Sequence, residues 1–169
     1  MKKVSVFVSV LSIFGSCTLP QHVPHPPTLD PSRVAVIKFS EPVHFINSQN
    51  TQEDIVVPVE SFNLSINLHE YTEAVITGLK SEFDRNGYPY SDAASKTMRI
   101  TVADVSLGSF MGGNVCNLDL VIQPGELRVI GIQASAKSLN YQKAIDYAVA
   151  DAIIKILSHS EITRFLEGR

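Results

Sequence analysis

The stretch MRITVADVSLGSFMGGNVCNLDLVI, residues 98–122, contains two runs of alternating apolar and polar residues that are joined by Gly112 and Gly113. Such alternation is typical of strands with one buried face, and the glycine pair is typical of a hairpin turn. The alternation changes phase after Val102, which predicts a β-bulge near Ala103-Asp104. In the second run the predicted inward face carries Cys116, Leu118, Leu120 and Ile122.

Further strands are predicted on both sides of this hairpin. Pro124-Gly125-Glu126 turns the chain into a third strand over Leu127 to Ala134. Upstream, the β-branched run at 34–39 predicts a mostly buried first strand. Residues 41–67 form a long insertion in which only Asp54 to Val59 resembles a strand. We expect an edge position there, because Pro58 cannot donate a ladder hydrogen bond.

Two long helices complete the pattern. Apolar residues recur at three- and four-residue steps from His69 to Asn86, where Asn86-Gly87 supplies a left-handed cap. A second helix begins near Asn140 and is rich in alanine. Ser158-x-x-Glu161 predicts a capping box for a short final helix.

The element order is therefore β-α-β-β-β-α, with a possible extra edge strand before the first helix. A crossover joins the first strand to the antiparallel meander, and both long helices pack on one face of the sheet. We predict an α+β fold, a two-layer sandwich formed by residues 33–169.

The N-terminus is typical of a secreted protein. Met1-Lys2-Lys3 is basic, and the apolar run from Val4 to Phe14 is too short, at about 1.5 Å per residue, to span a bilayer core of about 30 Å. Gly15, Ser16 and Cys17 follow, and this order resembles the lipobox of bacterial lipoproteins. The resemblance implies cleavage before Cys17 and a diacylglycerol on its thiol. An ordinary signal peptide and a buried N-terminal strand containing a cysteine remain alternatives.

The lipoprotein interpretation divides the chain into a signal peptide at 1–16, the lipidated Cys17 with a proline-rich linker at 17–32, and a periplasmic domain at 33–169. By the same resemblance, Thr18 is not the aspartate that retains lipoproteins in the inner membrane, so we expect the outer membrane, periplasmic face. The five prolines of residues 18–32 predict a semi-stiff spacer that lifts the domain off the lipid. His22 and His25 lack a third ligand there, and we predict no metal site.

The domain resembles the YajG-type uncharacterised lipoproteins. The matching residues are Asn86-Gly87-Tyr88, the alanine-rich helix from Ala144 to Leu157, and the tail Ser160-Glu161-Ile162-Thr163-Arg164-Phe165. The plan is also similar to the auxiliary lipoproteins of envelope lipid-transport ABC systems and to the lipoprotein activators of peptidoglycan synthases. These resemblances imply an envelope accessory protein and supply no catalytic residue.

Composition argues against several functions. The formal net charge is −3, and removing residues 1–16 takes away Lys2 and Lys3 with no acidic residue, which leaves −5. An acidic chain without a basic cluster disfavours nucleic acid as a partner.

Nucleophile-elbow and phosphate-loop motifs are absent, so we predict no enzyme activity and no cofactor. Cys116 has no positive neighbour and is expected in the core. Asp104 and Asp119 suit solvated strand positions better than acid–base catalysis.

Interaction surfaces remain. The candidate partner contacts are Phe110 and Met111 at the hairpin tip, together with Tyr88 and Tyr90 after the first helix; the alternative is that Phe110 and Met111 fold back over the sheet edge. We expect a non-enzymatic accessory protein, attached to the membrane through its lipid anchor, that binds another envelope protein. The first alternative is a carrier of a lipid or other hydrophobic ligand, held between the sheet and residues 41–67. The second is an envelope hydrolase with an unrecognised site.

Overall fold

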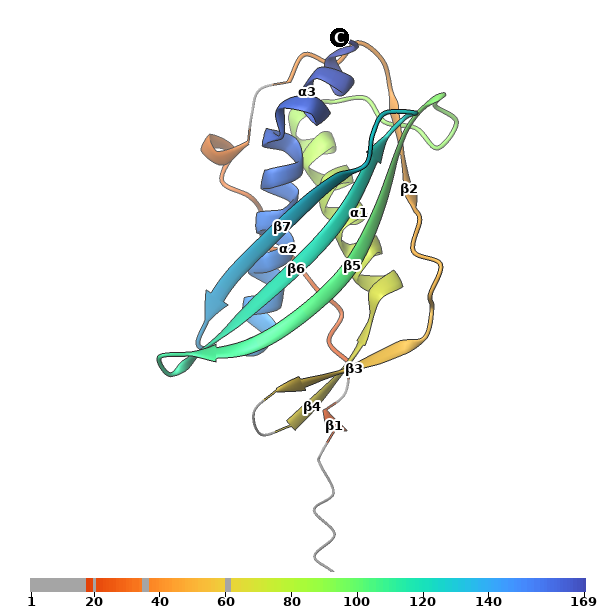
Figure 1. Ribbon diagram of the computed structural model, residues 1–169. Coiled ribbons are helices and arrows are strands. Elements are labelled where there is room, and N and C mark those ends of the chain that lie inside the picture. Colours follow the sequence, from red (N-terminus) through yellow and green to blue (C-terminus); the bar gives the residue numbers. More distant parts are fainter. Residues whose placement is uncertain (1–17, 20, 35–36, 60–61) are drawn as a thin grey trace, which may run out of the picture.

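The computed structural model describes residues 18–19, 21–34, 37–59 and 62–169. A four-stranded sheet in the order β2-β5-β6-β7 forms one layer, and the two long helices α1 and α2 cover one of its faces (Figure 1). A smaller sheet, in the order β1-β4-β3, lies at one end of the molecule (Figure 1). This arrangement confirms the predicted α+β sandwich.

The meander follows the alternating pattern. β5 (Lys96–Phe110), β6 (Gly113–Pro124) and β7 (Ile130–Ser138) are antiparallel neighbours, and the register shifts between Val102 and Asp104, where the bulge was predicted. Met111 (φ 42°) and Gly112 (φ 82°) turn the hairpin with positive φ at both positions, the conformation that a tight two-residue hairpin requires. The third strand begins at Ile130, later than predicted. Leu127 is half exposed because it still belongs to the turn, where its N–H donates to Pro124 O at 3.0 Å.

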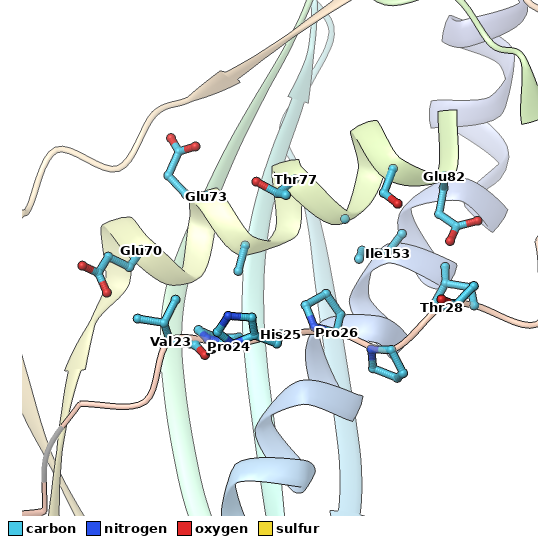
Figure 2. A pocket seen from close by; sticks show the side chains of 15 residues that line it. Val23, Pro24, His25, Pro26, Thr28, Glu70, Glu73, Thr77, Glu82 and Ile153 are labelled. Atoms are coloured by element: carbon cyan, nitrogen blue, oxygen red, sulfur yellow. Dashed lines mark hydrogen bonds between the residues drawn. The ribbon is translucent and has the colours of Figure 1, made fainter. Parts of the chain in front are cut away.

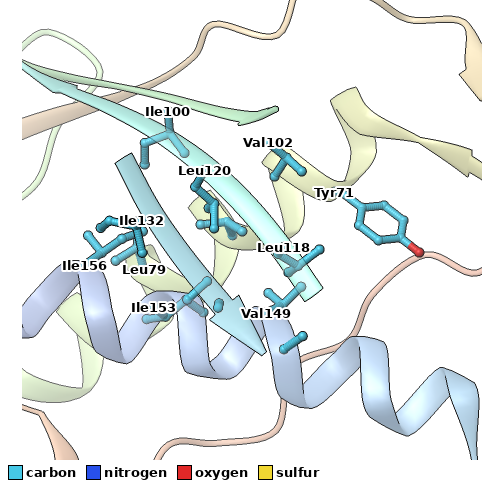
Figure 3. Packing of buried hydrophobic residues seen from close by; sticks show 14 of the residues in the cluster. Tyr71, Leu79, Ile100, Val102, Leu118, Leu120, Ile132, Val149, Ile153 and Ile156 are labelled. Atoms are coloured by element: carbon cyan, nitrogen blue, oxygen red, sulfur yellow. The ribbon is translucent and has the colours of Figure 1, made fainter. Parts of the chain in front are cut away.

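The helices lie where periodicity predicts them. Asn67 caps α1 (Leu68–Asn86), and Gly87 closes it in the left-handed conformation at φ 67°. Asn140 caps α2 (Tyr141–Ser158). Their apolar stripes pack on the sheet in one continuous core, whose centre is drawn in Figure 3 and includes Tyr71, Leu79, Ile100, Leu118, Leu120, Ile132, Val149, Ile153 and Ile156.

The predicted capping box is wrong. Ser158 is the last residue of α2, and the short helix α3 (Ser160–Glu167) begins after His159, whose side chain makes no capping hydrogen bond. Glu161 pairs instead with Arg128 in the turn before β7. The chain ends α2 and begins α3 within two residues, which leaves Ser158 inside a helix rather than at an N-cap.

The predicted first strand at 34–39 is also wrong for its described residues, and residues 35–36 lie outside them. The first strand of the large sheet is β2 (Val43–Asn47), parallel to β5. Ile37 is buried without joining a sheet, and its backbone N–H donates to the Tyr88 hydroxyl at 3.4 Å. A short apolar run indicates burial, but it does not by itself distinguish a strand from a buried extended segment.

The insertion at 41–67 is structured. Besides β2, it contains β3 (Asp54–Val59) and β4 (Phe62–Asn67), which pair antiparallel, and the two-residue β1 (Thr18–Leu19) pairs parallel to β4. β3 is an edge strand, as Pro58 predicted. Leu64 and Ile66 of β4 are fully buried and belong to the core.

Candidate functional site

Residues 21–29, called the strap below, lie along the outer side of the helix layer (Figure 2). Pro24 is buried, and Leu29 is only 5% exposed. The prediction of a spacer that lifts the domain off the lipid is therefore wrong for the described part of this segment. Its prolines indicate an extended conformation, which the strap has, but an extended chain can also bury its apolar side chains against a neighbour.

Polar contacts fix the strap to both helices. Gln21 bonds to Glu70 in the first turn of α1, and Arg85 Nη1, in the last turn, donates to Leu29 O at 2.8 Å. Between these ends, Asp146 of α2 accepts from the His25 backbone N–H at 2.8 Å. The strap thus follows α1 over its whole length.

Two side-chain pairs lie beside the strap. The buried carboxylate of Glu82, which is 4% exposed, forms an ion pair with Arg85. The same Arg85 guanidinium that donates to Leu29 of the strap therefore neutralises this buried negative charge. His22 Nε2 lies 2.9 Å from Asp146 Oδ1. His22 and His25 have ring centroids 6.5 Å apart, and among the residues that the structure describes no group of three or more potential ligands could hold a metal ion.

A groove of about 470 Å³ runs between the strap and α1. Its lining combines apolar side chains, small hydroxyl side chains and three glutamates, Glu70, Glu73 and Glu82. The close-up in Figure 2 shows Val23, Pro24, His25 and Pro26 along one side, with Glu70, Glu73 and Thr77 along the other. A drug-sized ligand or an extended peptide segment fits a groove of this volume.

Gly78 allows the close packing at the floor of the groove. A Cβ atom at this position would overlap Ile153 Cδ1 of α2 and would lie 3.5 Å from Pro26 Cγ of the strap. The glycine therefore lets α1, α2 and the strap meet at one point. Periodicity alone does not reveal this role, because the residues that surround Gly78 are far apart in the sequence.

The hairpin tip, residues 110–113, is exposed and apolar. Met111 is 93% exposed and Phe110 is 47% exposed, so the alternative in which both fold back over the sheet is wrong for Met111. Lys137 Nζ lies 3.7 Å from the centroid of the Phe110 ring. Leu139, 86% exposed, lies beside the tip, since its carbonyl accepts from Asn114 Nδ2 at 3.0 Å.

Tyr88 and Tyr90 do not join this surface. Both pack against Phe83, with ring centroids 5.7 and 6.3 Å from it, and are half-buried. Tyr90 bridges to Val43, which pairs with Lys96 at the start of β5. The tip lies at the other end of β5, and a strand of this length spans roughly 45 Å at about 3.3 Å per residue. The four candidate contacts therefore form two separate groups. Their roles in binding remain predictions.

The groove contains none of the residues that the sequence analysis weighed for chemistry, Cys116, Asp104 and Asp119. Cys116 is fully buried, and burial raises the pKa of its thiol to about 12, which keeps it protonated, as expected of a core residue. Asp104 and Asp119 face each other across β5 and β6, away from the strap groove. In the groove, His25 Nδ1 contacts Val23 O at 2.7 Å rather than a hydroxyl nucleophile.

Cys17 lies outside the described residues, and Thr18, which follows it, is paired with Asn63 of β4. Within the described part of the chain, no helix is long and apolar enough to cross a membrane.

No family model and no curated protein matches the sequence. Among solved structures, the chain is similar to the crystal structure of protein XCC0632 from Xanthomonas campestris, which is assigned to DUF330. The two chains are 10% identical, the alignment covers 89% of this chain and 95% of that one, and the TM-score is 0.46. At this level the likeness carries no argument about function.

Proposed function

We propose that this chain is a lipid-anchored accessory protein of the bacterial cell envelope, held at the periplasmic face of the outer membrane through Cys17, and that it binds another envelope protein without catalysing a reaction. The order of basic, apolar and small residues before Cys17 supports the anchor. The resemblance to the YajG-type lipoproteins supports the envelope location.

The observation that carries the binding role is the strap groove. It is built from two distant parts of the sequence, and hydrogen bonds near both ends fix the strap to α1. Its lining offers apolar surface together with hydroxyl groups and the carboxylates of Glu70, Glu73 and Glu82, and such a mixture of apolar and polar groups suits a recognition site. Among the described side chains of the groove, no hydrogen bond joins a hydroxyl group to His25 or to a glutamate, and His25 Nδ1 contacts Val23 O of its own segment.

Photo-cross-linking in living cells tests this role. A photoreactive amino acid replaces Thr77, which is exposed on α1 and lines the groove, and in a matched control it replaces Val121, which is 36% exposed on the other layer of the sandwich. We expect one envelope protein to be linked from position 77 and not from position 121. The absence of an adduct at 77, or the same adducts from both positions, would contradict the proposal.

The volume and apolar wall of the groove favour a second candidate, carriage of a hydrophobic ligand. Native mass spectrometry of the purified chain would then show co-purified lipid, and Thr77→Trp, which places a large side chain in the groove, would displace it. A protein that consistently carries no added mass would exclude the carrier function and leave the accessory function.

A further inference from the structure

We propose that the hairpin tip and Leu139 rest in the membrane that holds the anchor, so that the bilayer itself covers these exposed apolar side chains. The inference rests on the proposed function in one respect, because it requires the lipid on Cys17. It assigns the tip to a lipid surface rather than to a protein partner.

The start of the described chain lies beside the tip. Thr18, the residue after Cys17, pairs with Asn63, and strands in a sheet lie about 4.8 Å apart. The neighbour of Asn63 is Phe62, which lines a hollow of about 550 Å³ together with Met111 of the tip. Anchor and tip therefore belong to the same end of the molecule, and in Figure 1 the small sheet and the β5–β6 turn both lie in the lower part of the view.

The chain has no free length with which to lift this end away from the bilayer. As an extended spacer, residues 18–32 would reach roughly 46 Å at about 3.1 Å per residue. Instead Thr18 is already paired in β1, and the strap is bonded to α1 and α2. A lipid at position 17 thus brings the small sheet and the hairpin tip to the membrane surface together.

The side chains at this end suit a lipid surface. Met111 and Leu139 are 93% and 86% exposed, and both lie in short turns where they can enter the acyl boundary. The Lys137 ammonium lies 3.7 Å from the centroid of the Phe110 ring. When the apolar tip enters the bilayer, this cation lies at the depth of the negatively charged lipid phosphates, which attract it. The surrounding stretches, residues 105–118 and 134–145, contain two lysines and no acidic residue.

The opposite end of the sheet differs. It carries the charged pair of Arg128 with Glu161 and the half-exposed Leu127. If exposed apolar residues alone sufficed for membrane contact, Leu127 would qualify as well, but it lies at the end away from the anchor. Leu127 therefore provides a matched control of similar chemistry.

Tryptophan fluorescence can test the inference, because the chain contains no tryptophan. The full lipidated protein, carrying Met111→Trp or Leu127→Trp, is reconstituted into vesicles of phosphatidylethanolamine and phosphatidylglycerol with and without brominated acyl chains. We expect bromination to lower the fluorescence at position 111 at least two-fold, with emission shifted to the blue, and to leave position 127 unchanged. Both positions are exposed, and circular dichroism verifies that both variants keep the fold.

Mass spectrometry of the N-terminal peptide separates the two ways in which the experiment can fail. If the protein is bound to vesicles with an acylated Cys17 but the tryptophan fluorescence at position 111 is not quenched, the hairpin tip does not enter the membrane. This result would overturn the inference and leave the proposed function standing. Protein with unmodified Cys17 would overturn both. If position 111 becomes shielded only when an envelope protein is added, the tip is a protein contact and the inference is wrong.

Discussion

Thr72 connects α1 to the sheet at the point where β2 ends, and its replacement by valine has a calculable cost. β5 continues beyond its last pair with β2, Ile100 with Asn47, so Val102 has no strand neighbour on that side. Thr72 Oγ1 accepts from the Val102 N–H at 3.0 Å, and Gln49 Nε2 donates to the Val102 carbonyl at 2.8 Å. Two side chains thus complete the hydrogen bonds that the missing strand would have made.

Thr72→Val preserves the shape of the side chain and removes this acceptor. Thr72 and Val102 are both fully buried, so the Val102 N–H is left unpaired without access to water. Leaving a buried donor unsatisfied costs about 1–3 kcal/mol of the free energy of unfolding. For a chain of this size, about 2 kcal/mol lowers the melting temperature by roughly 4–8 °C.

Urea and thermal unfolding followed by far-UV circular dichroism measure this cost. Thr77→Val makes the same chemical change on the exposed side of the same helix and should stay within about 0.5 kcal/mol of the parent protein. Amide hydrogen exchange at Val102 should become faster in Thr72→Val alone. Equal stability of both variants and the parent, with unchanged exchange at Val102, would refute the account of how α1 is joined to the sheet.

Three further predictions concern the core, a surface pair and the strap. Because burial raises the pKa of Cys116 to about 12, its thiol should not react with iodoacetamide at pH 8 until urea is added, provided that the N-terminal cysteine is blocked; rapid native labelling would contradict this. The side-chain hydrogen bond from Arg128 lowers the pKa of Glu161, so the pair stabilises the fold above the unfolded pKa of Glu161 and loses this effect as pH falls through its lower folded value. Arg128→Ala should therefore lower the melting temperature at pH 7 and not at pH 3, and an equal deficit at both would exclude this linkage. Leu29→Ala should cost about 2–4 kcal/mol and make the strap cleavable by protease, whereas unchanged protection would show that the strap does not depend on this contact.

Local signals in the sequence were sufficient for the meander and the helices. Period-two alternation specifies the inward face of β6, and the glycine pair locates the turn to within one residue, since Met111 and Gly112 form it and Gly113 begins β6. Local sequence does not decide whether residues 34–39 or Val43–Asn47 form the first strand of the large sheet. Both runs are short and apolar, and which one meets the edge of β5 depends on how the chain returns after α1.

The candidate site shows the same limit. The position of the tip was predictable, because Phe110 and Met111 lie at a turn outside the alternating phase, but the sequence left open whether they are exposed or fold back over the sheet. The strap was not predictable, because its contacts with Arg85 and Asp146 join residues 56 to 121 positions apart in the sequence. Proline content indicates an extended conformation, but it contains no information about the surface against which that segment packs.

The mass of the mature N-terminal peptide, purified from bacterial membranes, tests the central proposal most directly. We predict a chain that begins at Cys17 and carries a diacylglycerol on its thiol. A mature chain that begins at another residue, or a Cys17 without lipid, would contradict the proposed lipid anchor. It would also contradict the contact of the hairpin tip with the membrane, which depends on that anchor.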